Sequence, residues 1–140
     1  HTRLYYVTGV QTCALPISEM TEAEAALYRR LLTVMEVERA YRDGSMTMAS
    51  LAKRLDTPEY RVRQLINQRL GYGNFARFVN SYRLAEARSA LADAGQARVP
   101  ILTIALDAGF ESIGPFNRAF KAVTGETPST FRKRTLAGPV

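Results

Sequence analysis

The sequence predicts an all-α protein of about seven helices, in which two units of a short helix, a turn and a longer helix are joined by one long helix. Three observations lead to this prediction. Beyond position 18, apolar residues recur at intervals of three and four, as they do on one face of a helix. No stretch there alternates apolar and polar residues with the period of two that a half-buried strand shows. Capping residues and glycines divide the pattern into segments of helical length.

The first eighteen residues differ from the rest. Residues 7–18 spell V-T-G-V-Q-T-C-A-L-P-I-S, which looks like the translation of a common sequencing-library adaptor. We therefore expect residues 1–18 to be an unstructured artefact, and the true N-terminal part to be missing. A short natural targeting segment is the alternative, but the segment has one positive charge, Arg3, and lacks the apolar run of a signal peptide. It also holds Cys13 and His1, the chain's only Cys and His, so we expect no disulfide, no metal site and no cofactor.

Residues 19–46 predict an N-terminal helix. Thr21 and Glu24 fit a capping box, in which each side chain accepts a hydrogen bond from the other residue's backbone. Leu27, Leu31 and Val34 continue one apolar face. The run Asp43-Gly44-Ser45 is expected to end the helix.

Residues 47–73 predict the first unit. A short helix spans about 47–55, and Thr57-Pro58 then supplies an N-cap residue followed by proline at the first helical position. The second helix is expected to end near Gly71, since glycine suits the left-handed residue after a helix. Residues 74–95 predict the long linker helix, whose expected buried residues are Phe75, Phe78, Val79, Tyr82, Ala87 and Leu91.

Residues 96–135 predict the second unit. A short helix spans about 101–108, Gly109 makes the turn, and a longer helix runs from Ser112 to about Thr124, where Gly125 ends it. Thr127-Pro128 is expected to cap a final short helix that ends near Arg134.

The two units form an internal repeat. Leu51-Ala52 matches Ile104-Ala105 at an offset of 53 residues, and after one extra residue in the second turn the offset becomes 54. At that offset Val62, Ile66 and Gly71 match Phe116, Phe120 and Gly125. A small residue in the first helix and two apolar residues four apart in the second are what a helix-turn-helix requires, since the helices must pack closely. The fold class is therefore two helix-turn-helix subdomains joined by a linker helix.

The second helix of each unit leaves a polar face uncovered. In the first unit this face comprises Glu59, Tyr60, Arg63, Gln64 and Asn67, with Arg61 on its flank, and in the second it comprises Ile113, Gly114, Asn117, Arg118 and Lys121. Arg, Gln and Asn form paired hydrogen bonds with guanine or adenine edges in the major groove of DNA. The alternative is an ordinary solvated helix face. The occurrence of such a face in both units favours a nucleic-acid interface.

The charge distribution agrees with that interpretation. The chain has 19 Lys and Arg against 13 Asp and Glu, with a net charge of +6 and a pI near 9.8. Residues 19–43 have a net charge of −2, whereas residues 44–134 have fourteen basic and seven acidic residues, a net charge of +7. The repeat thus lies in the basic part of the chain, and a basic surface favours phosphate-rich partners.

The second unit resembles the AraC/XylS family of transcription regulators. The runs that carry the resemblance are Ile101-Leu102-Thr103-Ile104-Ala105, Ala108-Gly109-Phe110-Glu111-Ser112, Phe116-Asn117-Arg118-Ala119-Phe120-Lys121, Gly125-Glu126-Thr127-Pro128 and Phe131-Arg132. The first unit and the linker run Tyr82-Arg83-Leu84 are also similar, so the resemblance spans about residues 27–134.

The resemblance implies a seven-helix domain whose two recognition helices enter successive major-groove segments about 34 Å apart. Tyr60, Arg63 and Gln64 would face bases in one segment, and Asn117 and Arg118 in the other. It also implies double-stranded DNA and RNA polymerase as partners, a cytoplasmic location, and an upstream effector or dimerisation domain that this chain lacks. The sequence departs from the family at Ile113 and Gly114, where polar residues are common. Either Ile113 touches a thymine methyl group, or this half mainly grips the DNA backbone.

Two other functions can be weighed against a sequence-specific regulator. An enzyme is not expected, because the chain has no nucleotide-binding glycine loop, and Asp107 and Glu111 have no basic or nucleophilic companion at helical spacing. The second is a helix-turn-helix module that binds protein, or binds nucleic acid without sequence preference, which the basic charge would serve equally well.

Overall fold

The computed structural model describes residues 19–138, so the expected artefact at residues 1–18 lies outside the described part. Residues 19–138 contain α-helices and short π and 3₁₀ turns but no strand. The predicted all-α fold class is therefore confirmed. The seven α-helices of this part are α2 Glu22–Leu32, α3 Met48–Arg54, α4 Glu59–Gln64, α5 Phe75–Leu91, α6 Ile101–Ala108, α7 Ile113–Thr124 and α8 Pro128–Ala137.

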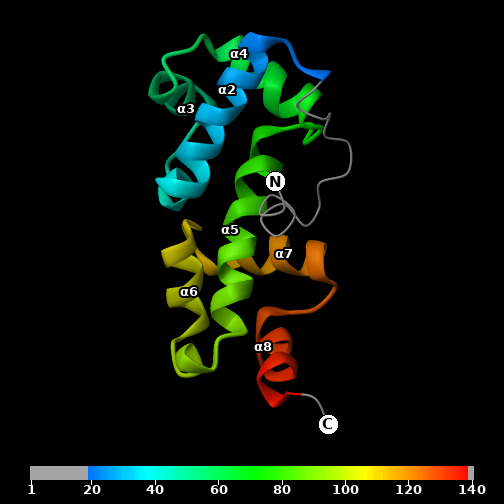
Figure 1. Ribbon diagram of the computed structural model, residues 1–140. Coiled ribbons are helices and arrows are strands. Elements are labelled where there is room, and N and C mark those ends of the chain that lie inside the picture. The colour runs from blue at the N-terminus through cyan, green and yellow to red at the C-terminus, as the bar shows by residue number, and fades with distance from the viewer. Residues whose placement is uncertain (1–18, 139–140) are drawn as a thin grey trace.

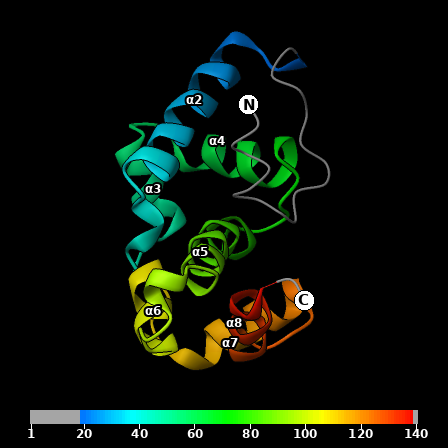
Figure 2. The ribbon, with the colours of Figure 1, turned by 60° about the horizontal axis from the view of Figure 1, so that its bottom comes forward.

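The linker helix α5 runs through the middle of the molecule, with α2–α4 around one half and α6–α8 around the other (Figures 1 and 2). Phe78, Val79 and Tyr82, in its first half, belong to the core that α2, α3 and α4 form. Leu84 and Leu91, further along α5, belong to a second core with α6, α7 and α8. Helix α5 has 17 residues and is about 25 Å long. Its buried side chains belong to both cores, so this one helix connects the two units.

Side-chain caps start most of the helices. The predicted capping box is confirmed: Glu24 N–H donates to Thr21 Oγ1 over 3.1 Å, and Thr21 N–H donates to Glu24 Oε1 over 3.0 Å. The predicted start of α8 is also confirmed, with Pro128 in the first turn and Thr127 Oγ1 accepting from Thr130 N–H. A second capping box joins Thr47, the N-cap residue of α3, and Ser50, the third residue of that helix. It was not predicted, because the third helical residue of a capping box is usually Glu or Gln rather than Ser.

The N-terminal helix ends earlier than predicted. After α2 a π turn covers Thr33–Val37, Arg39 adopts a left-handed conformation with φ 54°, and a 3₁₀ turn covers Ala40–Arg42. The prediction of a helix that continues to Asp43 was therefore wrong. This segment leaves the helical path to pack on α5: the Tyr41 ring stacks on Tyr82 with 5.7 Å between the ring centroids.

Three smaller predictions also need correction. Thr57 was predicted as the N-cap residue of α4, but Pro58 holds that position and α4 begins at Glu59. The Thr57 hydroxyl instead donates to the Leu55 carbonyl and accepts from Arg30, so it cannot cap the helix. Helix α8 continues to Ala137 rather than ending near Arg134, and Phe75 is half-buried rather than buried.

The two units have the same order of backbone conformations, in agreement with the repeat in the sequence. Asp56 and Gly109, 53 residues apart, make the turns of the two units, and both have positive φ, 49° and 113°. Helices α4 and α7 start 54 residues apart, and the glycines that follow them, Gly71 and Gly125, have φ of 80° and 82°. The one extra residue in the second turn is therefore located between the left-handed residue and the start of α7.

The left-handed Asp56 leads to a prediction about stability. A non-glycine residue in this conformation costs about 1–2 kcal/mol, and Asp somewhat less because its side chain bonds locally. Replacing Asp56 with glycine removes the strain but adds freedom to the unfolded chain, so we expect a net gain in unfolding free energy of about 0.5 kcal/mol. Asp56→Val should lose about 1–2 kcal/mol, since a β-branched side chain tolerates positive φ poorly. Urea unfolding of both variants checks this, and equal stability of the two would contradict the assigned conformation.

None of the helices formed by residues 19–138 has the length and the apolar composition needed to cross a membrane.

Candidate nucleic-acid interface

The predicted recognition face of the first unit lies on α4 and the π turn Leu65–Arg69 that continues it. Val62 and Ile66 are fully buried and hold the helix on its neighbours, while Arg61, Arg63 and Gln64 are exposed on the other side. Tyr60 is 67% exposed, which is unusual for a large aromatic residue and leaves its ring free to contact another molecule.

Arg63 and Glu59 form an ion pair across one turn of α4. Both side chains are about half exposed, so the pair adds little to stability. In this pair the guanidinium lies on the outer face of the helix, beside the carboxylate. An arginine held in this way can present its paired N–H groups to a base edge with less loss of side-chain freedom.

Asn67 lies differently from the other predicted residues of this face. It is half-buried, and its Oδ1 is buried without a hydrogen-bond partner among the described residues. Asn67 belongs to the π turn, in which the hydrogen bonds run from i to i+5, so it does not keep the α-helical register that would place it above Arg63. The sequence gives no signal for this turn.

The predicted recognition face of the second unit lies on α7, which is a regular α-helix of twelve residues. Phe116 and Phe120 are fully buried, while Asn117, Arg118 and Lys121 are exposed. Ile113 is 37% exposed, and Gly114 beside it is half-buried. A Cβ atom on Gly114 would lie 3.4 Å from Nη1 of Arg118, so the Arg118 guanidinium folds back over the first turn of α7.

The two faces use the same positions of the repeat. At an offset of 54 residues, Glu59 corresponds to Ile113, Tyr60 to Gly114, Arg63 to Asn117, Gln64 to Arg118, and Asn67 to Lys121. The chemistry at these positions differs: the first face begins with a carboxylate and a phenol, and the second with an isoleucine and a glycine.

A network of hydrogen bonds joins the 40–43 segment to the linker helix α5. From α5, Arg83 Nε donates to the Tyr41 carbonyl over 2.7 Å, and Arg83 Nη2 donates to the Asp43 carbonyl over 2.9 Å. Glu86, one turn further, accepts from the Tyr41 hydroxyl and from Arg42 Nε over 2.6 and 2.9 Å. Burial, and then the hydrogen bond to Glu86, raise the pKa of Tyr41 to about 12, so its hydroxyl remains a donor at all physiological pH values.

Gly109 completes this junction from the second unit. A Cβ atom at this position would lie 2.3 Å from the Tyr41 carbonyl oxygen and 2.7 Å from Arg83 Nε. The turn of the second unit therefore packs directly against the backbone that follows α2. Gly109 was predicted as the turn, but its neighbours Tyr41 and Arg83 were not, since contacts between residues far apart in the sequence leave no local pattern.

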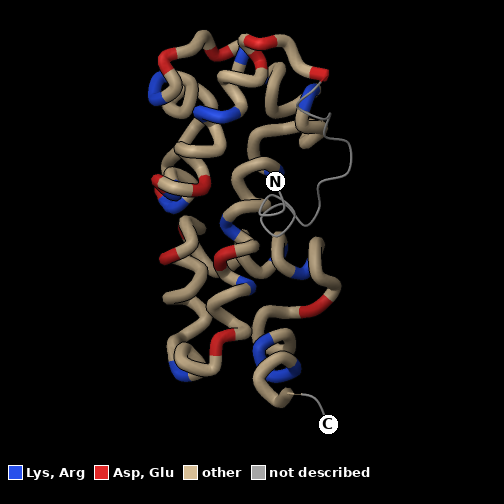
Figure 3. The backbone as a smooth tube through the Cα atoms, viewed as in Figure 1, with Lys and Arg blue, Asp and Glu red and all other residues tan. Residues whose placement is uncertain are grey.

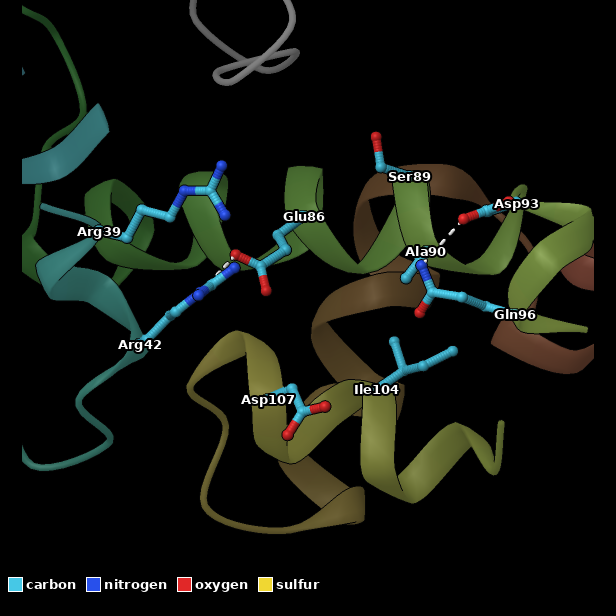
Figure 4. Close-up of a pocket in the computed structure, with 9 residues that line it drawn as sticks. All are labelled: Arg39, Arg42, Glu86, Ser89, Ala90, Asp93, Gln96, Ile104 and Asp107. Carbon is cyan, nitrogen blue, oxygen red and sulfur yellow. Dashed lines mark hydrogen bonds and ion pairs between the residues drawn. The ribbon is translucent and has the colours of Figure 1, made fainter. Parts of the chain in front are cut away.

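A hollow of about 670 Å³ lies beside this junction, between the Ala40–Arg42 turn, α5 and α6 (Figure 4). Its charged lining residues are Arg39, Arg42, Glu86, Asp93 and Asp107. This mixture lacks the positive bias that a phosphate site needs, and we do not include the hollow in the nucleic-acid interface. Figure 3 shows that Lys and Arg are spread over both units rather than confined to one helix.

Comparisons with known proteins agree with this geometry. A family model described as a helix-turn-helix domain matches residues 51–134, more than half of the chain. The arabinose operon regulatory protein of Escherichia coli is 31% identical over 90 residues, which are 64% of this chain and 30% of that protein. The protein of the same name from Salmonella typhimurium is also 31% identical over 90 residues. The chain thus matches less than a third of the length of these curated relatives.

Solved structures share the fold. The C-terminal domain of AraT, a response regulator from Geobacillus stearothermophilus, has a TM-score of 0.65 at 21% identity, with 83% of this chain and 88% of that chain covered. The C-terminal domain of the response regulator yesN from Fusobacterium nucleatum has a TM-score of 0.62 at 21% identity, with 80% and 99% covered.

Proposed function

Because the chain belongs to the AraC/XylS family of helix-turn-helix proteins, we propose that it regulates transcription by reading two successive major-groove segments of DNA with α4 and α7. Membership of the family itself makes this a DNA-binding domain of the kind that regulates transcription. The proposal adds the sequence preference and the roles of the two helices. We also propose that the chain acts by binding, without a catalytic step.

The observation that supports the proposal is that two helix faces at equivalent positions of the repeat both carry side chains able to bond to base edges, and that the linker helix α5 is part of both cores. On α4, Tyr60, Arg63 and Gln64 would face bases, with Glu59 orienting Arg63. On α7, Asn117 and Arg118 would do so. The remaining polar residues of the two faces, Arg61, Asn67 and Lys121, would hold the DNA backbone, and the N-terminal turn of α7 at Ile113 and Gly114 would lie against the DNA without hydrogen bonds to bases.

The partners of the complete regulator are part of the same proposal. The matched segment is 30% of the length of the arabinose operon regulatory protein, which leaves room in a full-length relative for further domains. We propose that an effector or dimerisation domain precedes this chain in the complete protein, and that RNA polymerase is a second protein partner.

A helix-turn-helix that binds nucleic acid without sequence preference, or that binds protein, remains the alternative, and one experiment separates them. A preferred site is selected from a pool of random double-stranded DNA, and its affinity is compared with that of scrambled DNA at fixed salt. A sequence-specific regulator should prefer its site by about 10³-fold or more. The salt dependence alone does not discriminate, because phosphate contacts make both kinds of binding steeply salt-dependent.

The spacing of the selected site tests the two-helix arrangement. We expect two conserved segments whose centres lie about 10 base pairs apart, one turn of the double helix. Inserting five base pairs between them turns the second segment to the opposite face of the DNA, so the rigid linker helix prevents simultaneous contact. The affinity should then fall to that of a single segment. An insertion without effect would contradict the proposal that both helices bind together.

A further inference from the structure

A groove of about 640 Å³ lies along the second recognition helix, between α6, α7 and the start of α8. Its apolar lining residues are Ile101, Leu102, Ile113 and Pro128, and among residues 19–138 its charged lining residues are the cations Arg118 and Lys121. Leu102 is 48% exposed and Ile113 is 37% exposed. This groove combines aliphatic side chains open to solvent with positive charge.

The position of the groove relates it to DNA. Ile113 occupies the repeat position that Glu59 has on α4, at the start of the recognition helix, which is the end that reaches base edges in a helix-turn-helix. The two cations complement the phosphates on either side of a major groove. An aliphatic side chain at this position cannot form a hydrogen bond with a base, so it needs an apolar partner there.

The major groove offers one apolar group, the methyl group on C5 of thymine. The same methyl group at the same position distinguishes 5-methylcytosine from cytosine. We propose that the second unit reads pyrimidine C5-methyl groups, with Ile113 and Leu102 forming the contact. This inference rests on the proposed function and specifies what α7 recognises.

Arg118 adds a second element to this recognition. Its guanidinium folds over Gly114, next to Ile113, with Nη1 3.4 Å from where a Cβ atom on Gly114 would lie. From there it reaches the base that neighbours the methylated pyrimidine, and guanine is the base that arginine bonds with two hydrogen bonds. The expected half-site therefore contains a thymine or 5-methylcytosine next to a guanine. Binding would then respond to cytosine methylation at that position.

The experiment replaces each thymine of the selected site, one at a time, with deoxyuridine, which lacks only the methyl group. At one or two positions we expect the affinity of the full chain to fall about fourfold, as for one methyl group withdrawn from an apolar contact. The same position is then filled with 5-methylcytosine in one DNA and with cytosine in another. The affinity for the DNA with 5-methylcytosine should exceed that for the DNA with cytosine by a similar factor.

Protein variants assign the effect to the groove. Ile113→Ala and Leu102→Ala should lose most of the preference for thymine over deoxyuridine, and Ile113→Val should retain it. Leu106→Ala is the matched control, because Leu106 lies on the same helix as Leu102 and is 46% exposed, but does not line the groove. Thermal unfolding of each variant confirms that it is folded.

The outcomes are distinct. If a preferred site is selected but contains no thymine position sensitive to deoxyuridine, the methyl inference is wrong and the proposed function stands. The same holds if the sensitivity persists unchanged in both Ile113→Ala and Leu102→Ala. If no preferred site is selected, the proposed function fails and the inference fails with it.

Discussion

Gly109→Ala is expected to destabilise the protein by about 3 kcal/mol, and Gly109→Val by more. Two costs add at this position. Gly109 has φ 113°, which strains any residue with a side chain by about 1–3 kcal/mol. In addition, the new Cβ atom would lie 2.3 Å from the Tyr41 carbonyl oxygen, a backbone atom that can move only if the packing of the 40–43 segment on α5 is disturbed. Urea unfolding of the variants measures the loss.

Gly125→Ala is the matched control. Gly125 also follows a helix with positive φ, 82°, but a Cβ atom there would have no neighbour within 4 Å. Gly125→Ala should therefore lower the unfolding free energy only by the cost of a non-glycine residue at positive φ, about 1–2 kcal/mol. Equal losses in the two alanine variants would show that the contact between the second turn and Tyr41 does not constrain the protein.

The fold could largely be predicted because its determinants are local. The capping box at Thr21, the proline and threonine that start α8, and the glycines that end α4 and α7 act within a few residues of their own position. The repeat then supplied the tertiary arrangement, since equal spacing of buried residues in two segments predicts two equal units. Such signals can be found by inspection of one sequence.

The parts that were missed depend on contacts between distant residues or on a backbone conformation that has no residue signature. Arg39 and Asp56 adopt left-handed conformations that sequence patterns assign to glycine, and the π turn at Leu65–Arg69 follows an ordinary helical pattern. As a result, the early end of α2 and the half-buried position of Asn67 were not foreseen. The hydrogen bonds of Arg83 and Glu86, which hold the 40–43 segment on α5, join residues 40 or more positions apart.

Arg63→Ala and Lys121→Ala are expected to weaken DNA binding in different ways. Arg63 is exposed on the outer face of α4, and its recorded contact is the ion pair with Glu59, so its removal should leave the fold intact. A paired contact between arginine and guanine contributes about 1–3 kcal/mol of discrimination. Arg63→Ala should therefore reduce affinity for the selected site by about 5- to 150-fold, with little change on scrambled DNA.

Lys121 is exposed two turns into α7, where a long flexible ammonium group reaches the phosphate backbone more readily than a base edge. Lys121→Ala should weaken binding to the selected site and to scrambled DNA by the same factor. It should also reduce the slope of log K against log salt by about one unit, as expected for the loss of one phosphate contact. A loss confined to the selected site would instead place Lys121 among the base-reading residues.

The affinity ratio between selected and scrambled DNA, measured for the unmodified chain and for Arg63→Ala under the same salt conditions, tests the central claim most directly. We expect a ratio of about 10³ or more for the unmodified chain, and a clear fall in that ratio for the variant. A ratio near one for the unmodified chain would contradict sequence-specific recognition. A high ratio that Arg63→Ala leaves unchanged would contradict the assignment of Arg63 as a base-reading residue of α4.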